Sequence, residues 1–226
     1  SDTELWIGSN KGLFLFDTRT ASFTPVSLYN DRMTDVSGFL ICALYQDVDK
    51  TLWIGTYGAG LTQFSPTKGI LSQYRHSTAP YSLSNDIVFF INRDSRGTLW
   101  IGTNKGLCRY VPETQDFISY LYDINKPTGI SSNRIDSFCE DSKGYLWFGT
   151  KDGGICRFDP KTELFRTYTK DIGLSSNQII GITDTGDGFL WIVALKYLNL
   201  FDTVHETAQA YNISNIHQYS YFSCPP

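Results

Sequence analysis

The sequence predicts an all-β fold, a β-propeller built from four-stranded antiparallel blades. Three observations predict it: a repeat of about 47 residues, four short strand-like segments in each repeat, and turns rich in glycine and aspartate at matching positions. The chain has 226 residues, of which 41% are hydrophobic and 15% aromatic. This composition can form a sizeable core and, with 19 glycines, favours short strands and tight turns over helices.

The five tryptophans mark the repeat. Their spacings are 47, 47, 47 and 44 residues, at Trp6, Trp53, Trp100, Trp147 and Trp191. The first four copies have glycine two residues after the tryptophan and a second glycine four or five residues later. In the fifth copy Val193 replaces the first glycine. Because every tryptophan follows one period, we expect internal structural repeats.

Each repeat contains four strand-like segments, most clearly in its fourth copy. These are residues 134–140, 145–150, 154–158 and 163–168. Each is five to seven residues long, rich in β-branched or aromatic side chains, and bounded by Gly, Pro or Asp, as strands in hairpins are. Helical repeats of this length need amphipathic runs of about 10–15 residues without glycine, and the sequence has none.

The turn between the first and second segments recurs. Asp94 is followed by Gly97 and Asp141 by Gly144. An aspartate that bonds the turn backbone, followed by a glycine with positive φ, closes a short hairpin. We therefore expect the same hairpin in both repeats.

The long connection before the first segment ends in a recurring Ser-Asn or Ser-Gly pair. The pairs begin at Ser37, Ser84, Ser132, Ser176 and Ser214. Because asparagine and glycine tolerate a left-handed backbone best, their alternation predicts that conformation at the second residue of the pair.

The packing of the blades also follows from the repeat. Tryptophan and the next glycine but one lie on the same face of the second segment. Stacked blades bury both faces, so we expect all five tryptophans between blades and the glycine to make room for a large ring of a neighbour. In the first segment the strongest apolar positions are three apart, as in Ile135 and Phe138, which predicts a β-bulge.

The number of blades follows from counting segments. The chain opens in the second segment of a blade, and residues 216–223 stand where a further first segment is expected. This gives five blades of four strands in one domain, residues 1–226. Two arrangements remain open: a closed five-bladed ring, in which the terminal strand pairs with the first blade, or part of a larger ring with open edges.

Charge and composition exclude several protein classes. The chain has 23 acidic and 19 basic residues, a net charge of -4, whereas a nucleic-acid-binding protein normally has a basic excess. No apolar run approaches the ~18–20 residues of a membrane helix. Five scattered cysteines, at Cys42, Cys108, Cys139, Cys156 and Cys224, indicate small buried side chains more than disulfides or metal ligands. The first residues do not form a signal peptide, so an export signal would lie outside this chain.

The repeat resembles a known family. Leu-Trp-Ile-Gly-Thr with a following Gly-Leu, the preceding Leu-Ser-Ser-Asn and the turn Asp-Ser-Lys-Gly resemble the two-component regulator propeller repeat, from Glu4 to about Tyr211. The resemblance implies the periplasmic sensor region of a hybrid two-component system of gut Bacteroidetes. It also implies an oligosaccharide ligand, and as partners the remainder of a sensor kinase or a second propeller.

No catalytic motif accompanies the repeat. The three histidines, at His76, His205 and His217, do not recur at the repeat period, and no nucleophile, phosphate-loop or zinc motif is present. The acidic segment 184–188 falls at a hairpin turn, which favours a turn over a calcium site. We therefore expect a non-enzymatic protein without cofactor or metal. A protein-interaction scaffold is the alternative function, and a propeller lyase is a third that the scarcity of histidine disfavours.

The predicted binding residues lie in loops at one rim of the propeller. The loops between the second and third segments carry Asn10, Lys11, Tyr57, Asn104, Lys105, Lys151 and Asp152. These donors, acceptors and one aromatic ring suit a hydroxyl-rich or acidic sugar, although Lys and Asn also simply solvate exposed turns. The connections entering the first segments add Arg75, His76, Tyr81 and Tyr122.

Overall fold

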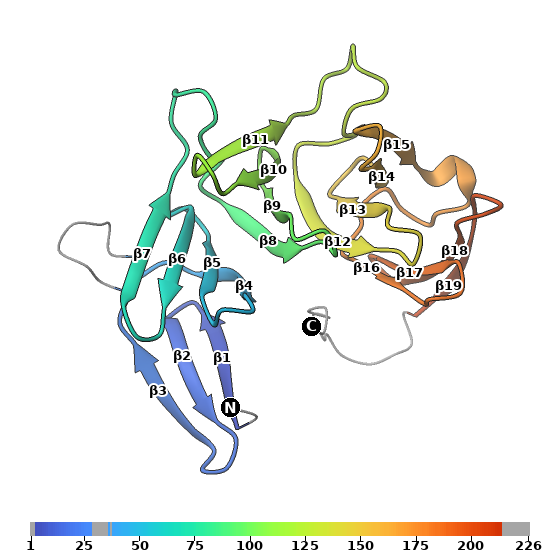
Figure 1. Ribbon diagram of the computed structural model, residues 1–226. Coiled ribbons are helices and arrows are strands. Elements are labelled where there is room, and N and C mark those ends of the chain that lie inside the picture. Colours follow the sequence, from blue (N-terminus) through green and yellow to red (C-terminus); the bar gives the residue numbers. More distant parts are fainter. Residues whose placement is uncertain (1–2, 29–35, 37, 214–226) are drawn as a thin grey trace. The chain divides into compact units, whose positions relative to one another are not determined.

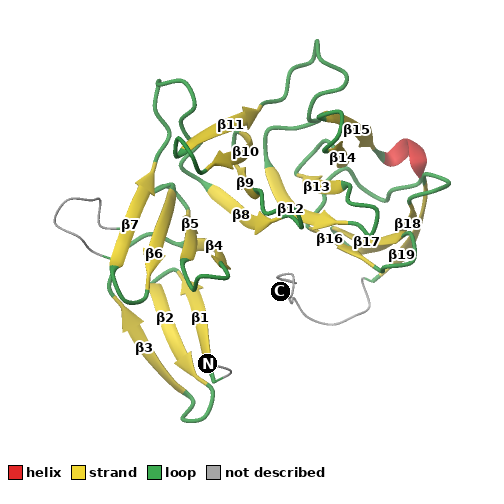
Figure 2. Cartoon of the chain, viewed as in Figure 1, coloured by secondary structure: helices red, strands yellow, loops and turns green. Residues whose placement is uncertain are grey.

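The computed structural model describes residues 3–28, 36 and 38–213 (Figure 1). It confirms the all-β prediction: nearly all regular structure is strand, as Figure 2 shows, and the strands form five antiparallel sheets of the propeller-blade type. The single helix in the described ranges is the 3-10 turn Lys170–Ile172, so none of them reaches membrane-crossing length.

Each sheet is a meander in chain order. Sheet 1 has three strands, β1 (Glu4–Ser9), β2 (Gly12–Asp17) and β3 (Ser22–Val26). Sheet 2 comprises β4 (Ile41–Gln46), β5 (Leu52–Thr56), β6 (Leu61–Ser65) and β7 (Gly69–Tyr74). Sheet 3 comprises β8 (Val88–Arg93), β9 (Leu99–Thr103), β10 (Gly106–Val111) and β11 (Asp116–Tyr120).

Sheets 4 and 5 repeat this pattern. Sheet 4 comprises β12 (Ile135–Glu140), β13 (Leu146–Thr150), β14 (Ile155–Asp159) and β15 (Leu164–Tyr168), each within one residue of the predicted segments. Sheet 5 comprises β16 (Gly181–Asp184), β17 (Phe189–Ala194), β18 (Tyr197–Asp202) and β19 (Thr207–Asn212). We call the strands of each four-stranded sheet first to fourth; β1, β2 and β3 correspond to the second, third and fourth.

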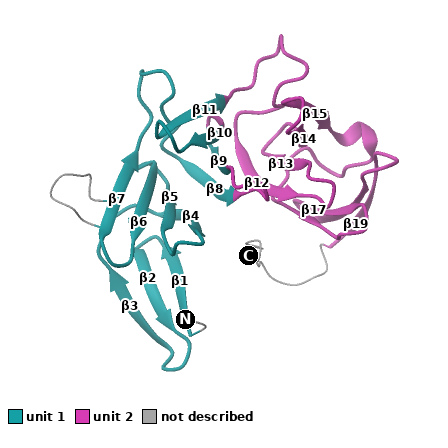
Figure 3. Ribbon diagram, viewed as in Figure 1, with its two compact units in different colours: residues 1–92, 99–104, 108–119 teal, residues 93–98, 105–107, 120–226 magenta. Residues whose placement is uncertain are grey.

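The chain divides into two compact units, coloured in Figure 3. Unit 1 contains residues 1–92, 99–104 and 108–119, and unit 2 contains residues 93–98, 105–107 and 120–226. One domain over residues 1–226 stays a prediction, as does the choice between a closed and a larger ring. The predicted closing strand, 216–223, lies outside the described residues.

The first strands carry the predicted bulge. In sheet 2 the register of β4 against β5 shifts between Ile41 and Ala43, and in sheet 4 that of β12 against β13 shifts between Ile135 and Ser137. An extra residue in the first strand explains the three-residue spacing of its apolar positions.

The predicted hairpin turn forms as expected. Oδ1 of Asp141 accepts hydrogen bonds from the backbone N–H groups of Lys143 (2.9 Å) and Tyr145 (3.0 Å), and Gly144 has a φ of 81°. Oδ2 of Asp141 also accepts a bond from the indole of Trp147, at 2.8 Å. The aspartate therefore connects the turn to the core, which the sequence alone did not reveal.

At Gly8, Gly55 and Gly149 the glycine after the tryptophan makes room for a branched aliphatic side chain, not for the large ring we expected. A Cβ on Gly55 would lie 2.5 Å from Cγ1 of Val88, and one on Gly149 would lie 2.7 Å from Cγ2 of Ile179. Val88 and Ile179 come from the segments that begin or precede the first strand of the following sheet.

Three of the five tryptophans lie fully within the core as predicted, namely Trp53, Trp100 and Trp147. Trp6 in sheet 1 and Trp191 in sheet 5 are only partly buried. Sheet 1 is more exposed throughout: Leu5 is 54% exposed, whereas the equivalent Leu52 is 1% exposed.

Two of the cysteines are buried as predicted and also act as hydrogen-bond acceptors. Sγ of Cys108 lies 3.4 Å from the backbone N of Ser84, and Sγ of Cys156 lies 3.3 Å from that of Ser131. In sheet 5, Oδ1 of Asn199 accepts the equivalent bond from Ser175. In sheets 3, 4 and 5 a buried side chain of the third strand thus holds the loop that enters the same sheet.

Candidate ligand-binding loops

Two kinds of loop meet at one end of each sheet, because neighbouring strands are antiparallel. One kind joins the second strand to the third. The other, here called the connecting loop, joins the fourth strand of one sheet to the first strand of the next. Backbone bonds join the two kinds at equivalent places: Tyr57 N to Leu40 O (2.8 Å), Asn104 N to Ile87 O (3.0 Å) and Lys151 N to Arg134 O (3.1 Å).

A second set of bonds fixes each connecting loop through one Asp or Asn. The backbone carbonyl of Asp86 accepts from Gly60 N at 2.9 Å, and its Oδ1 accepts from His76 N at 2.7 Å. The side chains of Asn133 and Asn177 accept the equivalent bonds from the backbone of the loops that precede them. The backbone of each connecting loop is therefore held at both ends. The exposed side chains of the loop then determine which molecules this surface can bind.

These bonds explain the recurring asparagine and correct our prediction for it. Gly38, Asn85, Asn133 and Asn177 do not have positive φ, so the predicted left-handed conformation is wrong. Asparagine recurs because its side-chain oxygen accepts backbone N–H groups. In the third repeat this role falls on Asp86, one residue after the predicted position.

In unit 1 the structure connects two of the predicted side chains. Tyr57 is 54% exposed, and the guanidinium of Arg75 donates from Nη2 to the carbonyl of the adjacent Gly58, at 2.8 Å. Arg75 also pairs with Asp86, with Nη2 3.2 Å and Nε 3.4 Å from Oδ2. An exposed phenol ring, a guanidinium and a carboxylate thus lie on two loops that hydrogen bonds hold together at the same end of sheet 2.

The other loop residues of unit 1 are placed as follows. Asn10 and Lys11 are exposed in the turn between β1 and β2. His76 donates from Nδ1 to the carbonyl of Leu83 at 2.9 Å, so its imidazole supports the loop. Tyr81 is 65% exposed and has a φ of 65°.

In unit 2, Lys105 and Lys151 are exposed at the starts of their turns. Asp152 accepts a hydrogen bond from the hydroxyl of Ser132, which fixes one carboxylate oxygen. Tyr122 is partly exposed. Since Asn10, Lys11, Tyr57 and Asn104 belong to unit 1 and the other three predicted residues to unit 2, a single site made of all seven stays a prediction.

Sequence reasoning named Arg75 but missed Asp86. A signal was present: Asp86 lies 47 residues before Asn133, one repeat period, so it occupies the same structural position. The pairing of Arg75 with it was not visible, because the lengths of the connecting loops differ.

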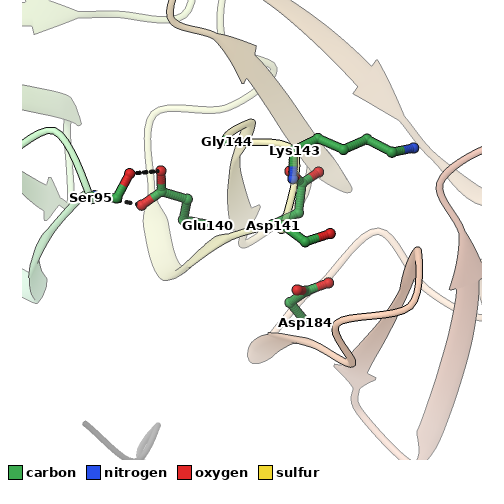
Figure 4. Close-up of a pocket in the computed structure, with 7 residues that line it drawn as sticks. Ser95, Glu140, Asp141, Lys143, Gly144 and Asp184 are labelled. Carbon is green, nitrogen blue, oxygen red and sulfur yellow. Dashed lines mark hydrogen bonds between the residues drawn. The ribbon is translucent and has the colours of Figure 1, made fainter.

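A shallow depression lies at the opposite end of the sheets in unit 2, where the first and second strands turn (Figure 4). Its volume is about 580 Å³, and it is lined by Ser95, Glu140, Asp141, Ser142, Lys143, Gly144 and Asp184. Glu140 faces Ser95 and accepts bonds from its N–H and its hydroxyl, both at 2.6 Å. Asp141 is occupied by its own turn. These contacts hold neighbouring turns together, and we assign the depression a structural role.

The structure also places the residues that could bind a metal ion. Within residues 3–28, 36 and 38–213, no three His, Cys, Asp or Glu side chains group closely enough to hold a metal ion. His205 is an exposed turn residue paired with Asp202 at 2.7 Å, and His217 lies outside the described residues. The acidic segment 184–188 forms the turn between β16 and β17.

Three segments of the chain match the two component regulator propeller family, residues 37–58, 82–105 and 129–152. Each covers the end of a connecting loop, the first strand and the second strand of sheets 2, 3 and 4. The resemblance proposed from the sequence is thereby confirmed for these three repeats. No curated protein sequence matches the chain.

Several solved structures share the fold. The extracellular domain of BT3049 from B. thetaiotaomicron, described as a hybrid two component system, has a TM-score of 0.69 at 25% identity. The match covers 76% of this chain and 24% of that one, so the chain spans about a quarter of the length of this relative.

Two more distant structures show the fold alone. Virginiamycin B lyase from Staphylococcus aureus has a TM-score of 0.66 at 16% identity, covering 95% of this chain and 71% of the lyase. PorZ of Porphyromonas gingivalis, a surface component of the type-IX secretion system, has a TM-score of 0.62 at 14% identity. The match covers 84% of this chain and 29% of PorZ.

Proposed function

We propose that this chain is a sensor-type propeller module of an extracytoplasmic signalling protein and that it binds an oligosaccharide at its loops. The observation that carries the proposal is the group formed by Tyr57, Arg75 and Asp86. An exposed aromatic ring provides a stacking surface, while the guanidinium and carboxylate donate to and accept from sugar hydroxyls. The ion pair is half exposed, so it is available to a ligand and contributes little to stability.

The similarity to the extracellular domain of BT3049 supports the sensor assignment and a periplasmic location. The partners would then be the remainder of a hybrid two-component protein or a second propeller. A binding role also agrees with the loop chemistry, because the imidazole of His76 donates to a backbone carbonyl and so supports the loop.

A scaffold function is the second candidate, favoured by the exposed apolar face of sheet 1. Leu5 and Phe23 are 54% and 58% exposed. Isolated exposed apolar residues are ordinary, but two on one sheet face mark a surface that another protein could cover.

A thermal-shift screen against plant, host and microbial oligosaccharides tests the proposal. A ligand at ~100 times its dissociation constant adds about 2.7 kcal/mol, which raises the unfolding midpoint by several degrees. We expect Tyr57→Ala and Arg75→Lys each to lower the affinity, derived from the concentration dependence of the shift, at least tenfold. Asn104→Ala with Lys105→Ala tests the wider loop prediction.

The matched control is Lys161→Ala, an exposed lysine in the turn between β14 and β15, at the opposite end of sheet 4. It should leave the shift unchanged. Equal affinity of the Tyr57 and Arg75 variants would refute the site, and a partner protein captured without any sugar response would favour the scaffold.

A further inference from the structure

A tyrosine recurs near the end of the fourth strand in sheets 2 to 5. The set comprises Tyr74, Tyr120, Tyr168 and Tyr211. Three of them pair with the residue at the same position of the third strand: Leu61 with Tyr74, Ile155 with Tyr168, and Leu198 with Tyr211. In sheet 1 the equivalent pair is Leu13 with Val26. Sheet 1 therefore has a small aliphatic side chain where the other sheets have a phenol ring.

The recurring tyrosine completes an aromatic group between sheets. Tyr74 stacks beside Trp53 with ring centroids 6.0 Å apart and contacts Tyr110 of the next sheet at 5.6 Å. Tyr168 lies 5.6 Å from Trp147 and 5.2 Å from Phe201 in the same way. One tyrosine ring thus fills the space between a tryptophan and the aromatic residue of the following third strand.

In sheet 1 no side chain of the described residues fills that space. Trp6 meets Phe64 of sheet 2 edge-on with centroids 6.2 Å apart, but Val26 leaves the tyrosine position unfilled. A hollow of about 820 Å³ lies there, within unit 1. Its apolar wall is formed by Trp6, Leu15, Val26 and Phe64, and its rim includes Glu4, Gln46, Asp49, Lys50, Ser65 and Thr67.

We propose that this hollow is a binding site for a planar aromatic ring of the phenol class, which takes the place of the missing tyrosine. The tryptophan is partly exposed, and the walls are already aromatic on two sides. Such a ring gains burial and edge-to-face contacts that the protein itself supplies at the other positions. The site lies at the opposite end of sheet 2 from Tyr57 and does not depend on the proposed sugar site.

The rim supports a hydroxyl on that ring. In two of the four filled positions the phenol has a polar partner: Tyr74 Oη lies 3.0 Å from Tyr110 Oη, and Tyr168 Oη donates to Glu206 at 2.9 Å. At the hollow, Ser65 and Thr67 carry hydroxyls 3.2 Å apart on the third-to-fourth turn of sheet 2. We therefore expect a preference for a phenol over an unsubstituted ring.

The site is tested by titrating the protein with p-cresol. Binding is detected from the tryptophan indole N–H signals in nitrogen-15 NMR spectra. Trp6→Phe assigns the Trp6 signal. We expect a saturable shift of this signal, with the signals of Trp53 and Trp147 unchanged. Val26→Tyr fills the hollow and should lower the affinity more than tenfold, whereas Val26→Ala should retain binding. Toluene should bind more weakly than p-cresol.

A Trp6 signal that does not respond, or that responds equally in Val26→Tyr, would overturn the proposal. Should Val26→Tyr not fold, Tyr74→Val provides the converse test, since it opens the equivalent space beside Trp53. That variant should gain a p-cresol response at Trp53, and no gain would count against the site.

A titration with a tyrosine-containing peptide shows whether the ring comes from a protein or from a small free phenol. Gly-Tyr-Gly amide is titrated under the same conditions. Binding at least tenfold tighter than p-cresol supports the site and indicates a tyrosine side chain of a protein. Weaker binding of the peptide, with p-cresol still saturating, supports the site for a small free phenol. Failure of both refutes it.

Discussion

A single methyl group decides the fit between neighbouring sheets at Gly149. A Cβ there would meet the hydroxyl oxygen of Ser137 and lie 2.7 Å from Cγ2 of Ile179. We expect Gly149→Ala to lower the free energy of unfolding by about 1–3 kcal/mol, measured by urea denaturation. Because Ser137 presents the tighter contact, Ser137→Gly in the same chain should restore part of that loss.

Strict additivity of the two substitutions would contradict this packing argument, since residues in contact show coupling. Gly38 provides the control. It has no atom within 4 Å of an added Cβ and no positive φ, so Gly38→Ala should change stability by no more than about 0.5 kcal/mol.

The sequence predicted the burial of Cys108 and Cys156 but not their hydrogen bonds. Burial of a thiol follows from its apolar neighbours in the strand, which are visible in the sequence. The bonds to Ser84 and Ser131 depend on how each connecting loop folds back over its own sheet, which no local pattern encodes. Burial also raises the pKa of both thiols above the ordinary range, so they should react slowly with alkylating reagents in the folded protein.

At the level of the strand and its turns, Asp141 holds a hairpin to the core. It accepts bonds from two turn N–H groups and from the indole of Trp147. We expect Asp141→Ala to cost about 2–4 kcal/mol in the free energy of unfolding, because a buried indole N–H loses its acceptor as well. Thermal and urea unfolding measure this loss.

Asp187→Ala in the turn of sheet 5 is the matched control. Asp187 is exposed and takes its one described side-chain bond from Thr185, so its loss should cost about 0.5 kcal/mol or less. A loss as large as that of Asp141→Ala would show that turn closure, and not the indole, dominates.

The strands could be predicted closely because hairpin signals are local. All four strands of sheet 4 began and ended within one residue of expectation, and the bulge near Ile135 followed from side-chain spacing. The prediction of left-handed asparagines was wrong because asparagine recurs for two different reasons: tolerance of positive φ and the acceptor oxygen of its side chain. Asn133 is selected as a side-chain acceptor, and a sequence pattern does not distinguish this from backbone tolerance.

At the scale of unit 2, Glu206 joins sheets 4 and 5. It pairs with Arg166, accepts a bond from Tyr168 Oη at 2.9 Å, and lies 4.0 Å from Arg157. Burial, followed by the hydrogen bond to Glu206, raises the pKa of Tyr168 to about 12. The proton therefore stays on the folded protein at pH values where the unfolded chain, with an ordinary pKa of about 10, loses it.

The contribution of Tyr168 to stability is thus complete below pH about 10 and is lost as the pH rises to about 12. We expect the free energy of unfolding to fall over this range and to fall less steeply in Tyr168→Phe. Urea denaturation at several alkaline pH values measures both slopes. Identical slopes would mean that this hydroxyl is not coupled to folding.

The candidate site could be predicted only in part, because it depends on how long loops fold. Loop positions such as Tyr57 followed from the repeat, and their exposure was foreseen. The partnership of Arg75 with Asp86 was not, because it depends on the path of a 13-residue connection, 75–87, between β7 and β8.

Sheet 5 shows how a repeat of this kind can change without losing its packing. In sheets 2 and 4 a glycine in the second strand pairs with Ala43 or Ser137, whereas in sheet 5 Val193 pairs with Gly181. One member of the pair is a glycine in all three sheets, but in sheet 5 the glycine lies on the first strand instead of the second. A side chain on the first strand and one on the second are therefore alternatives at this pair, because side chains on both would make the close contact described for Gly149 and Ser137. The fifth repeat departs from the sequence pattern, yet its pair still satisfies the packing requirement that the pattern expresses.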